Sequence, residues 1–534
     1  MKKEIMVTLQ HIAYTHPNQD ILFQNINLTL NRHHKAALIG NNGAGKSTLL
    51  KIIAGDLPPA DGSVKISSKP YYVPQLFGQF NHLTVAQALR IETKLAAFKE
   101  ILDGHVTEEN LELLNDDWTL EERCQEAQQY WQLTDLDLTQ PMSTLSGGQK
   151  TKVFLAGIFI HQPEIVLLDE PSNHLDTAGR ALLYKFIQST SSTLLVVSHD
   201  RTLLNLLDLV LELGKRGITV YGGNFEFYQE QKSIQSQALT EDVKSKEKAL
   251  RKAKEVERKT AERQQKLDAR GKKKQEKAGL PKIVMNTLKN SAENSTAELK
   301  GVHAEKIGTI AQELTALRQE LPDVDRMKFN FDQSALHQGK ILVTAQDINY
   351  GYSGQLLWTK PLNFRITSGE RIALKGLNGS GKTTLIKIVL GQLEPKSGAV
   401  YRVVKQAVYI DQDYSLINNH LNIYEQAQQF NRTTLQEHEI KIRLNRFLFT
   451  KDDWDKSCSA LSGGEKMRLL LCCLTISNQA PDMIILDEPT NNLDIQNTEI
   501  LTAAINEYQG TLLVVSHDAY FLKQINVERT IDLA

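Results

Sequence analysis

Short apolar runs alternate along this chain with segments whose apolar positions follow helical spacing. The runs Ala36–Ile39 and Ile165–Leu168 are typical of buried strands, and residues 48–53 are typical of a helix. Later in the chain, strand-like runs at Ile372–Leu374 and Ile484–Leu486 repeat this order. Because strands that alternate with helices form mainly parallel sheets, we predict an α/β fold with two such domains in one chain.

The two halves of the chain form a duplication that includes more than these elements. The segment Leu-Leu-Val-Val-Ser-His-Asp closes each half, and it places His199 and His517 30 residues after Asp169 and Asp487, respectively. The first half carries an extra stretch within about 90–118, where charged and leucine-rich sequence predicts a short helical excursion. An ordinary loop insertion is the alternative interpretation of that stretch.

The sequence between the two halves has a different composition. Residues 241–282 contain 16 Lys/Arg against 8 Asp/Glu and almost no aromatic residues, and such long polar side chains favour helix. Gly279–Pro281 interrupts the helix because proline disfavours it at the preceding residue, and a second helical segment covers about 295–321. We predict a basic helical hairpin whose first helix, of about 45 residues, reaches roughly 65–70 Å. A solvated charged linker is the alternative.

Composition places the chain among ordinary globular proteins. A length of 534 residues exceeds what one hydrophobic core supports, so several domains are expected. The net charge of −1 gives no overall attraction to nucleic acid or membranes, and the four cysteines form no C-x-x-C pair, which predicts reduced thiols in a cytoplasmic protein. Neither a signal peptide nor a run long enough for membrane insertion is recognised in the sequence.

A glycine-rich loop of the pattern G-x-x-x-x-G-K-[ST] lies between a predicted strand and a predicted helix in each half. Backbone N–H groups of such loops surround phosphate oxygens, the lysine approaches the β- and γ-phosphates, and the Ser or Thr hydroxyl can bind Mg²⁺. The ATP-binding residues predicted here are Gly40, Asn41, Asn42, Gly43, Ala44, Gly45, Lys46, Ser47 and Thr48 in the first half and Gly376, Leu377, Asn378, Gly379, Ser380, Gly381, Lys382, Thr383 and Thr384 in the second.

Acidic and polar residues after the predicted strands supply the remaining chemistry. Hydrolysis of a phosphoanhydride needs a held Mg²⁺ and an aligned water, and carboxylates at the carboxyl end of a strand suit both tasks. We predict that Mg²⁺ is bound by Ser47, Asp169 and Gln75 in the first half and by Thr383, Asp487 and Gln412 in the second. The predicted catalytic residues are Glu170, Glu488, His199, His517, Gln75 and Gln412. Tyr14 and Tyr350 are predicted to stack on the base, and core packing is the alternative for both. Tyr352 is a further candidate ring in the second half.

A Leu-Ser-Gly-Gly segment opens a predicted helix in each half and has no general acid or base of its own. Its hydroxyl and N–H groups form a second anion-binding surface, which has no phosphate within its own half. The segments are useful if the halves face each other, so that each nucleotide is covered by the opposite segment. The residues concerned are Ser146, Gly147, Gly148 and Gln149 and, in the second half, Ser462, Gly463, Gly464 and Glu465.

Together these motifs resemble the ATP-binding cassette (ABC) superfamily, with Walker A, Q-loop, signature, Walker B, D-loop and H-switch in both halves. The D-loops are Ser172–Asp176 and Thr490–Asp494. Two cassettes in one chain, a basic helical linker and the segment Tyr221–Tyr228 resemble the F subfamily of ribosome-associated ATPases. The resemblance implies a first cassette over 1–228, a linker over 229–335 and a second cassette over 336–534.

The resemblance also implies a mechanism and partners. Two ATP molecules with Mg²⁺ would bind between head-to-tail cassettes of a monomer, the first completed by Ser462 and Gly464 and the second by Ser146 and Gly148. Members of the subfamily bind ribosomal RNA near the E site and extend the linker toward P-site tRNA and the peptidyl-transferase region. The insert at about 90–118 would be a reduced arm. Glu465 in place of Gln removes no phosphate contact, so both sites are expected to hydrolyse ATP.

Two other functions are compatible with twin cassettes. The chain could be the motor of a transporter with a separate permease, or an ATPase that acts on DNA. The long linker has no role in the first, and the second is disfavoured because neither cassette is interrupted by a coiled coil or zinc module. Whether the chain provides antibiotic resistance or serves ordinary translation depends on tip residues near Leu280–Met285, and both alternatives stay open.

Overall fold

The structure is a computed structural model of the whole chain, and most of the sequence can be described in it. The described residues are 4–16, 19–75, 77–214, 217–278, 301–318, 327, 339–352, 355–377, 379–432, 435–477, 480–491 and 493–533. Asn378 of the second glycine-rich loop, the predicted bend at Gly279–Pro281 and the predicted tip at Leu280–Met285 lie outside these residues.

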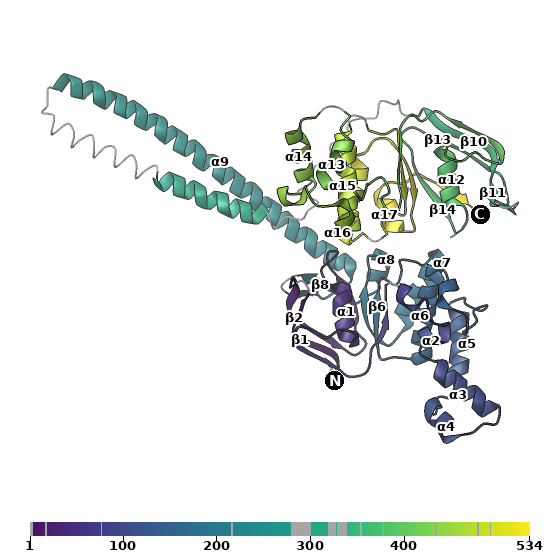
Figure 1. Cartoon of the computed structure of the whole chain (residues 1–534). Coiled ribbons are helices and arrows are strands. Elements are labelled where there is room, and N and C mark those ends of the chain that lie inside the picture. Colours follow the sequence, from purple (N-terminus) through teal and green to yellow (C-terminus); the bar gives the residue numbers. More distant parts are fainter. Residues whose placement is uncertain are drawn as a thin grey trace. The chain divides into compact units, whose positions relative to one another are not determined.

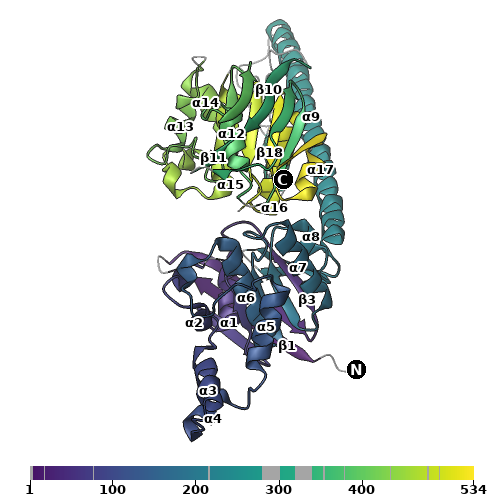
Figure 2. The ribbon, with the colours of Figure 1, turned by 90° about the vertical axis from the view of Figure 1, so that its right-hand side faces the viewer.

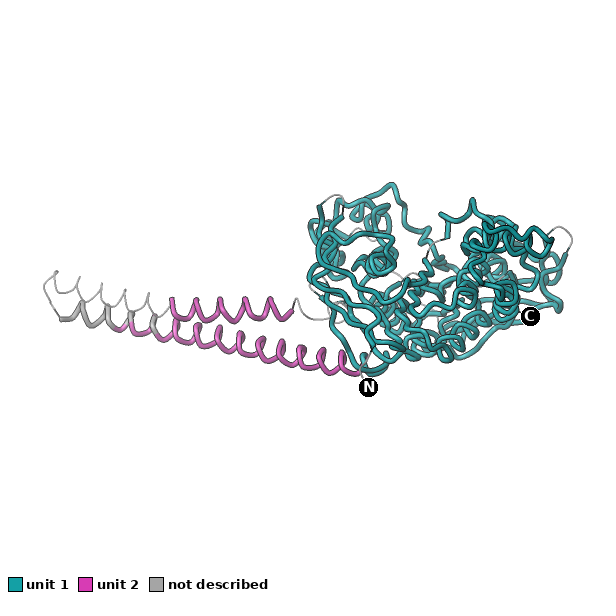
Figure 3. Tube along the Cα trace, turned by 90° about the horizontal axis from the view of Figure 1, so that it is seen from below, with its two compact units in different colours: residues 1–228, 327–534 teal, residues 229–326 magenta. Residues whose placement is uncertain are grey.

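The chain divides into two compact units (Figure 3). The first unit contains Met1–Tyr228 and Met327–Ala534, and the second contains Gln229–Arg326. Within the first unit we call the part before Tyr228 the first copy and the part from residue 339 onward the second copy.

Strands and helices alternate in the first copy (Figure 1). Its strands are β1 (Ile5–Thr15), β2 (Ile21–Asn31), β3 (Lys35–Ile39), β4 (Asp61–Ile66), β5 (Tyr71–Val73), β6 (Ile165–Asp169), β7 (Thr193–Val197), β8 (Leu209–Gly214) and β9 (Gly217–Tyr221). Its helices are α1 (Lys46–Ala54), α2 (Val85–Ala88), α3 (Glu92–Leu102), α4 (Glu108–Leu114), α5 (Leu120–Tyr130), α6 (Gly147–His161), α7 (Thr177–Ser189) and α8 (Arg201–Leu204).

The second copy repeats this order of elements (Figure 2). Its strands are β10 (Ile341–Asn349), β11 (Gly351–Tyr352), β12 (Gln355–Leu356), β13 (Leu362–Thr367), β14 (Arg371–Gly376), β15 (Ser397–Arg402), β16 (Ala407–Ile410), β17 (Met483–Asp487), β18 (Thr511–Val515) and β19 (Arg529–Leu533). Its helices are α12 (Lys382–Val389), α13 (Ile423–Gln429), α14 (Glu437–Arg446), α15 (Gly463–Ile476), α16 (Ile495–Glu507) and α17 (Ala519–Gln524).

Each copy is built on a parallel sheet, which confirms the predicted α/β class. The strand order is β5-β6-β7-β3-β8-β9 in the first copy, where β9 is antiparallel, and β16-β17-β18-β14-β19 in the second. The alternation of side chains puts Val166 and Leu168 in the core beneath α5, α6 and α7. Ile165 and Leu167 face the opposite core, which contains α1. Both faces of the sheet are therefore buried, as in doubly covered parallel sheets.

A separate antiparallel sheet in each copy was not anticipated from the sequence. It has the order β2-β1-β4 in the first copy and β13-β10-β15 in the second. Its buried residues, such as Leu9 and Ile26, join the same core as α1. These strands alternate between apolar and polar positions because only one face of the antiparallel sheet is buried.

The extra stretch of the first copy contains the helices α3 and α4 rather than an irregular loop. Thr107 caps α4 by accepting a hydrogen bond from the N–H of Asn110. Asp117 accepts a hydrogen bond from Lys94 at 2.9 Å and a further bond from Arg123, which connects the stretch to α5. Leu102 and Val106 at the far end of the stretch are exposed.

The second unit is dominated by α9 (Phe225–Ala278), a helix of 54 residues. The helix is longer than predicted because it begins before residue 229, where the Asn224 side chain accepts a hydrogen bond from the N–H of Phe227. At 1.5 Å per residue it spans roughly 80 Å. Residues 301–318 are also helical and lie beside α9 (Figure 3), with ion pairs from Lys246 to Glu313 and from Arg318 to Glu247.

Gly62 of β4 packs against a bulge in β1, and this contact predicts that alanine lowers the stability more at Gly62 than at Gly55. Gly62 has φ +94°, and a Cβ there would lie 2.5 Å from the carbonyl oxygen of Gln10, whereas Gly55 has φ +82° and open space around it. We expect Gly62→Ala to lower the free energy of unfolding by about 3 kcal/mol and Gly55→Ala by about 1 kcal/mol. Chemical denaturation measures both; equal losses would contradict the packing argument.

Candidate functional site

The carboxyl ends of the parallel strands bring the sequence-predicted residues together in each copy. Asp169 of β6 pairs with Val197 of β7, so the residues that follow these strands, Glu170 and His199, lie at one edge of the sheet. The same register pairs Asp487 with Val515 in the second copy. Ligands of open α/β sheets bind outside this edge. We call the site around Lys46 site 1 and the site around Lys382 site 2.

Each glycine-rich loop turns directly into a helix. Gly45 and Gly381 precede α1 and α12 with φ values of 96° and 89°, in the left-handed region that glycine adopts without strain. Lys46 Nζ donates to the carbonyls of Gly40 at 2.8 Å and Asn41 at 3.1 Å, so the lysine lies across its own loop. Lys382 repeats this arrangement with Gly376 and Leu377.

The glutamates that follow the strands are held in a strained backbone conformation. Glu170 has φ 51° and Glu488 has φ 48°, a region that costs a non-glycine residue about 1–3 kcal/mol. The N–H of Glu170 donates to the carbonyl of Val197 at 2.8 Å, and the N–H of Glu488 donates to Val515 at 2.9 Å. The neighbouring strand therefore fixes the direction of each glutamate.

A histidine lies beside each of these glutamates. His199 Nε2 is 3.2 Å from Glu170 Oε1, and His517 Nε2 is 3.4 Å from Glu488 Oε1. Burial raises the pKa of Glu170 to about 8 and that of Glu488 to about 7. Burial also lowers the pKa of His199 to about 3 and that of His517 to about 4. Each pair thus offers a carboxyl group poised to exchange a proton next to a neutral imidazole.

The aspartates that end β6 and β17 accept a hydrogen bond that sequence reasoning missed. The Tyr72 phenol donates to Asp169 Oδ2 at 3.1 Å, and the Tyr409 phenol donates to Asp487 Oδ2 at 2.9 Å. Each tyrosine orients one carboxylate oxygen by this bond. The available signal was the tyrosine at matching places in the two β-rich stretches before Gln75 and Gln412.

The residues around Asp169 fit a magnesium ion that enters with a nucleotide. Asp169 Oδ1 is buried without a hydrogen-bond partner among the described residues, and the Ser47 hydroxyl interacts electrostatically with the same carboxylate. Gln75 lines the cavity beside them. No cluster of three His, Cys, Asp or Glu side chains suited to a metal occurs in the described part of the chain. A hydroxyl, one carboxylate and an amide suit Mg²⁺, which takes few protein ligands and completes its shell with phosphates and water.

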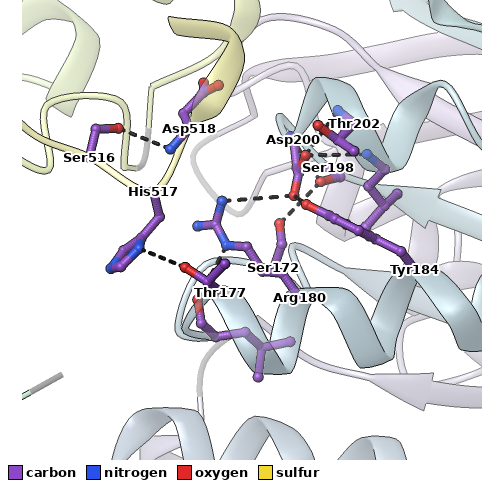
Figure 4. Close-up of polar contacts among 12 residues, drawn as sticks. Ser172, Thr177, Arg180, Tyr184, Ser198, Asp200, Thr202, Ser516, His517 and Asp518 are labelled. Carbon is purple, nitrogen blue, oxygen red and sulfur yellow. Dashed lines mark hydrogen bonds and ion pairs between the residues drawn. The ribbon is translucent and has the colours of Figure 1, made fainter. Parts of the chain in front are cut away.

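Site 2 contains residues of both copies. A cavity of about 1180 Å³ is lined by its glycine-rich loop and by Asp487, Glu488 and His517 of the second copy. The first copy contributes the segment Ser146–Gln149 to the same cavity. The predicted approach of one Ser-Gly-Gly segment to the opposite loop is therefore present at this site. Figure 4 shows the loop with His517 facing Thr177 at the start of α7, where His517 Nδ1 is 3.4 Å from Thr177 Oγ1.

Site 1 is assembled differently. Its cavity of about 360 Å³ is lined, among the described residues, by side chains and backbone of the first copy, including Lys46, Glu170 and His199. The segment Ser462–Glu465 is not part of this lining. The second copy reaches the loop through Asp494 instead, whose Oδ2 accepts a hydrogen bond from the N–H of Asn42 at 2.8 Å.

The aromatic residues predicted to stack on the base lie against the core. Tyr14 packs beside Phe23, and Tyr350 belongs to the rim of the corresponding core in the second copy. The rings that line the cavities are found two residues later in both copies, at His16 in site 1 and Tyr352 in site 2. His16 directly follows the end of β1, and Tyr352 belongs to the short strand β11, so both rings lie beyond the strands whose side chains pack in the core.

The two signature helices begin with the same cap. Ser146 accepts a hydrogen bond from the N–H of Gln149, and Ser462 accepts one from the N–H of Glu465. Burial acts to raise the pKa of Glu465, but hydrogen bonds from Ser462 and Lys456 outweigh it and hold that pKa below its usual value. The second signature therefore carries a negative charge where the first carries a neutral amide.

Comparison with known proteins gives matches over nearly the whole chain. A family model described as ABC transporter matches residues 23–173 and 359–491. The erythromycin resistance ATP-binding protein MsrA of Staphylococcus epidermidis is 31% identical over 540 residues, which cover 97% of this chain and 96% of that protein. The ABC transporter F family member 5 of Arabidopsis thaliana is 30% identical over 568 residues, which cover 99% of this chain and 75% of that protein.

A solved structure shares the fold of both copies. The archaeal ribosome recycling factor aABCE1, solved in complex with a ribosomal stalk protein, aligns with a TM-score of 0.60 at 20% identity. The alignment covers 98% of this chain and 87% of that chain. In the part of the chain that the structure describes, no helix has the length and apolar character that a membrane crossing requires.

We predict that replacing Lys46 or Lys382 removes ATP binding at its own site and leaves the other site intact. Lys46→Ala and Lys382→Ala should each reduce the ATP bound at saturation from about two to about one molecule per chain, because each lysine serves its own loop. Lys51→Ala is a matched control, since Lys51 is an exposed lysine of the same helix as Lys46. Equilibrium dialysis with labelled ATP measures the stoichiometry, and a loss of both ATP molecules in either single variant would contradict independent loops.

Proposed function

The chain belongs to the F family of ATP-binding cassette proteins, and on that premise we propose that it binds ATP at two sites and uses the resulting closure and hydrolysis to bind and release the ribosome. The two copies are its two cassettes, and ATP hydrolysis is the activity of this family. The observation that carries the proposal is site 2, where a glycine-rich loop, a half-buried acid pair and a histidine of one cassette share a cavity with the signature of the other.

The proposed chemistry divides the work among a few residues of each cassette. Lys382 neutralises charge on the terminal phosphates once it leaves the carbonyls of its own loop. Glu488 aligns and deprotonates the attacking water, because its backbone is fixed by the neighbouring strand and its pKa lies near 7. His517, neutral in this environment, donates to or accepts from the groups around the terminal phosphate. Lys46, Glu170 and His199 do the same at site 1.

Magnesium would be held by Ser47, Asp169 and Gln75 at site 1 and by Thr383, Asp487 and Gln412 at site 2. The metal supplies charge neutralisation at the β- and γ-phosphates when it is bound. Tyr72 and Tyr409 keep one oxygen of each aspartate occupied, so the other oxygen is the one left for the metal. We assign the base-facing positions to His16 and Tyr352 because these rings line the cavities.

Closure of the cassettes is the proposed output of ATP binding. The Ser-Gly-Gly N–H groups at the start of α6 and α15 are suited to phosphate, and each segment would bind the nucleotide of the opposite cassette. A single chain supplies both cassettes, so a monomer is sufficient. Opening would follow when hydrolysis removes the terminal phosphate that both cassettes bind.

A ribosomal partner is supported by the linker and by the relatives. Residues 241–282 carry an excess of eight positive charges, and Arg251, Lys252 and Lys254 of α9 are exposed. A basic helix of this length suits the phosphates of ribosomal RNA and tRNA. MsrA is named for erythromycin resistance, an antibiotic phenotype that a ribosomal site of action would explain. We infer that the linker reaches toward P-site tRNA and that the protein acts in the cytoplasm as a translation or resistance factor.

Removing both catalytic glutamates should separate ATP binding from hydrolysis. The double variant Glu170→Gln with Glu488→Gln should lose about 100-fold or more in steady-state ATPase rate, because an amide cannot accept the proton of the attacking water. The same variant with ATP should co-sediment with ribosomes at moderate salt. Lys46→Ala with Lys382→Ala is the control that cannot close. If the glutamine variant stays in the supernatant, the ribosomal function is wrong.

The charge of α9 predicts a salt dependence that can be measured separately. Replacing Arg251, Lys252 and Lys254 by Gln should reduce the slope of log affinity against log salt by about 2 to 3, since each phosphate contact contributes about 0.7 to 0.9. The matched control replaces three exposed cassette lysines, Lys65, Lys69 and Lys360, by Gln. Sedimentation with ribosomes from about 50 to 300 mM salt gives both slopes. Equal slopes in the two triple variants would contradict binding through α9.

A further inference from the structure

One cation of the first cassette lies in the second ATP site. Arg180 is in the first turn of α7, where the positive end of the helix dipole disfavours a positive side chain. Its Nε donates to the carbonyl of Leu175 at 3.2 Å, and its guanidinium lies 3.8 Å from Asp200 Oδ2. Figure 4 shows the side chain extending from α7 toward the second-cassette loop that contains His517. A residue that breaks a local rule in this way is a candidate for function.

The guanidinium shares the cavity of site 2 with the residues that the proposed chemistry uses. Arg180 lines this cavity together with Lys382, Glu488 and His517. Among charged groups, the Arg180 guanidinium has the strongest electrostatic interaction with the Glu488 carboxyl group. The side chain is only 13% exposed, so water screens this interaction weakly. The first cassette thus places a fixed positive charge next to the glutamate of the second.

The partner of the guanidinium is itself anchored. Asp200 accepts a hydrogen bond from the Tyr184 phenol, and its own N–H donates to the Ser198 hydroxyl at 3.1 Å (Figure 4). Asp518, the residue equivalent to Asp200 in the second cassette, interacts electrostatically with both Asp200 and Arg180. The guanidinium therefore lies among acidic groups of both cassettes and holds them near one another.

Among the described residues, site 1 has no cation at the position equivalent to Arg180. The offset that relates Asp169 to Asp487 and His199 to His517 relates Arg180 to Thr498. The Thr498 hydroxyl donates to the carbonyl of Asp494 at 3.0 Å within its own helix, and the residue is buried. A threonine can supply neither the reach nor the charge of an arginine. The opposite cassette therefore contributes an arginine to site 2 and a threonine at the equivalent position for site 1.

We propose that Arg180 is a positioning residue that the first cassette contributes to site 2, where it orients Glu488 and His517 for hydrolysis of the ATP bound there. This proposal rests on the proposed roles of these two residues. A carboxylate and the terminal phosphate of ATP repel each other, and a fixed cation between the cassettes reduces that repulsion as they close. Site 2 would then require the first cassette both for its signature and for this charge, whereas site 1 would function without it.

The test measures a single turnover of labelled ATP in the full chain, which reports the chemical step before release of products. Glu170→Gln silences site 1, so that this background reports site 2, and Glu488→Gln gives the background that reports site 1. In the first background, Arg180→Ala should slow hydrolysis about tenfold with less than about twofold change in ATP affinity. Arg180→Lys should recover most of the rate, because the charge is restored.

The matched controls use the other background and the equivalent position. In the Glu488→Gln background, both Arg180→Ala and Thr498→Ala should change the site 1 rate by less than about threefold. An equal loss from Arg180→Ala in the two backgrounds would mean that the arginine only supports the cassette interface, and an unchanged site 2 rate would also overturn the proposal. If the Glu170→Gln with Glu488→Gln chain still hydrolyses ATP at the parent rate, the glutamate roles themselves are wrong, which is a different result.

Discussion

The hydrogen bond from the N–H of each glutamate that we propose as catalytic to the adjacent strand is the constraint on which the rest of the site depends. It joins Glu170 to Val197 and Glu488 to Val515, and it keeps both glutamates in a backbone conformation that an isolated chain would avoid. Because the strand is buried on both faces, the carboxylate cannot relax away. The glutamate carboxyl group therefore lies in a buried environment beside a neutral histidine, and this burial raises its pKa to a value that suits proton transfer.

The duplication gives both cassettes the same motifs, but the two sites differ in what the opposite cassette contributes. Site 2 combines the loop of one cassette with the signature and Arg180 of the other, whereas the second cassette contacts the loop of site 1 through Asp494. The charged Glu465 adds to the difference, since the signature that we propose covers site 1 on closure carries a carboxylate at its helix start. Two ATP molecules bound to this chain would therefore meet different charges and need not be hydrolysed at the same rate.

The linker and the cassettes are stabilised by different kinds of contact. The cassettes are stabilised by two cores on either side of a parallel sheet. Because the packing is close, even a small change in a core side chain lowers the stability. Most of the described side chains of α9 are instead exposed, and the helix is joined to residues 301–318 by ion pairs of modest strength. Its sequence is therefore free to vary in charge and contact residues without loss of the ATPase fold, which makes it the natural carrier of specificity.

Sequence alone determined the α/β class, the duplication, the two glycine-rich loops and the basic helix, because these depend on periodicity and on residue types at short spacing. It also identified the acids and histidines of each site, since they follow strands whose carboxyl ends must meet at one edge. Only tertiary structure decided that His16 and Tyr352 rather than Tyr14 and Tyr350 line the cavities, because the sequence pattern does not show where the packed strands β1 and β10 end and which ring beyond them reaches the cavity. Likewise, nothing near Arg180 in the sequence indicates its position beside Glu488; that position arises because residues 308 apart in the chain lie at one interface, where long-range packing and not local pattern selects the neighbours.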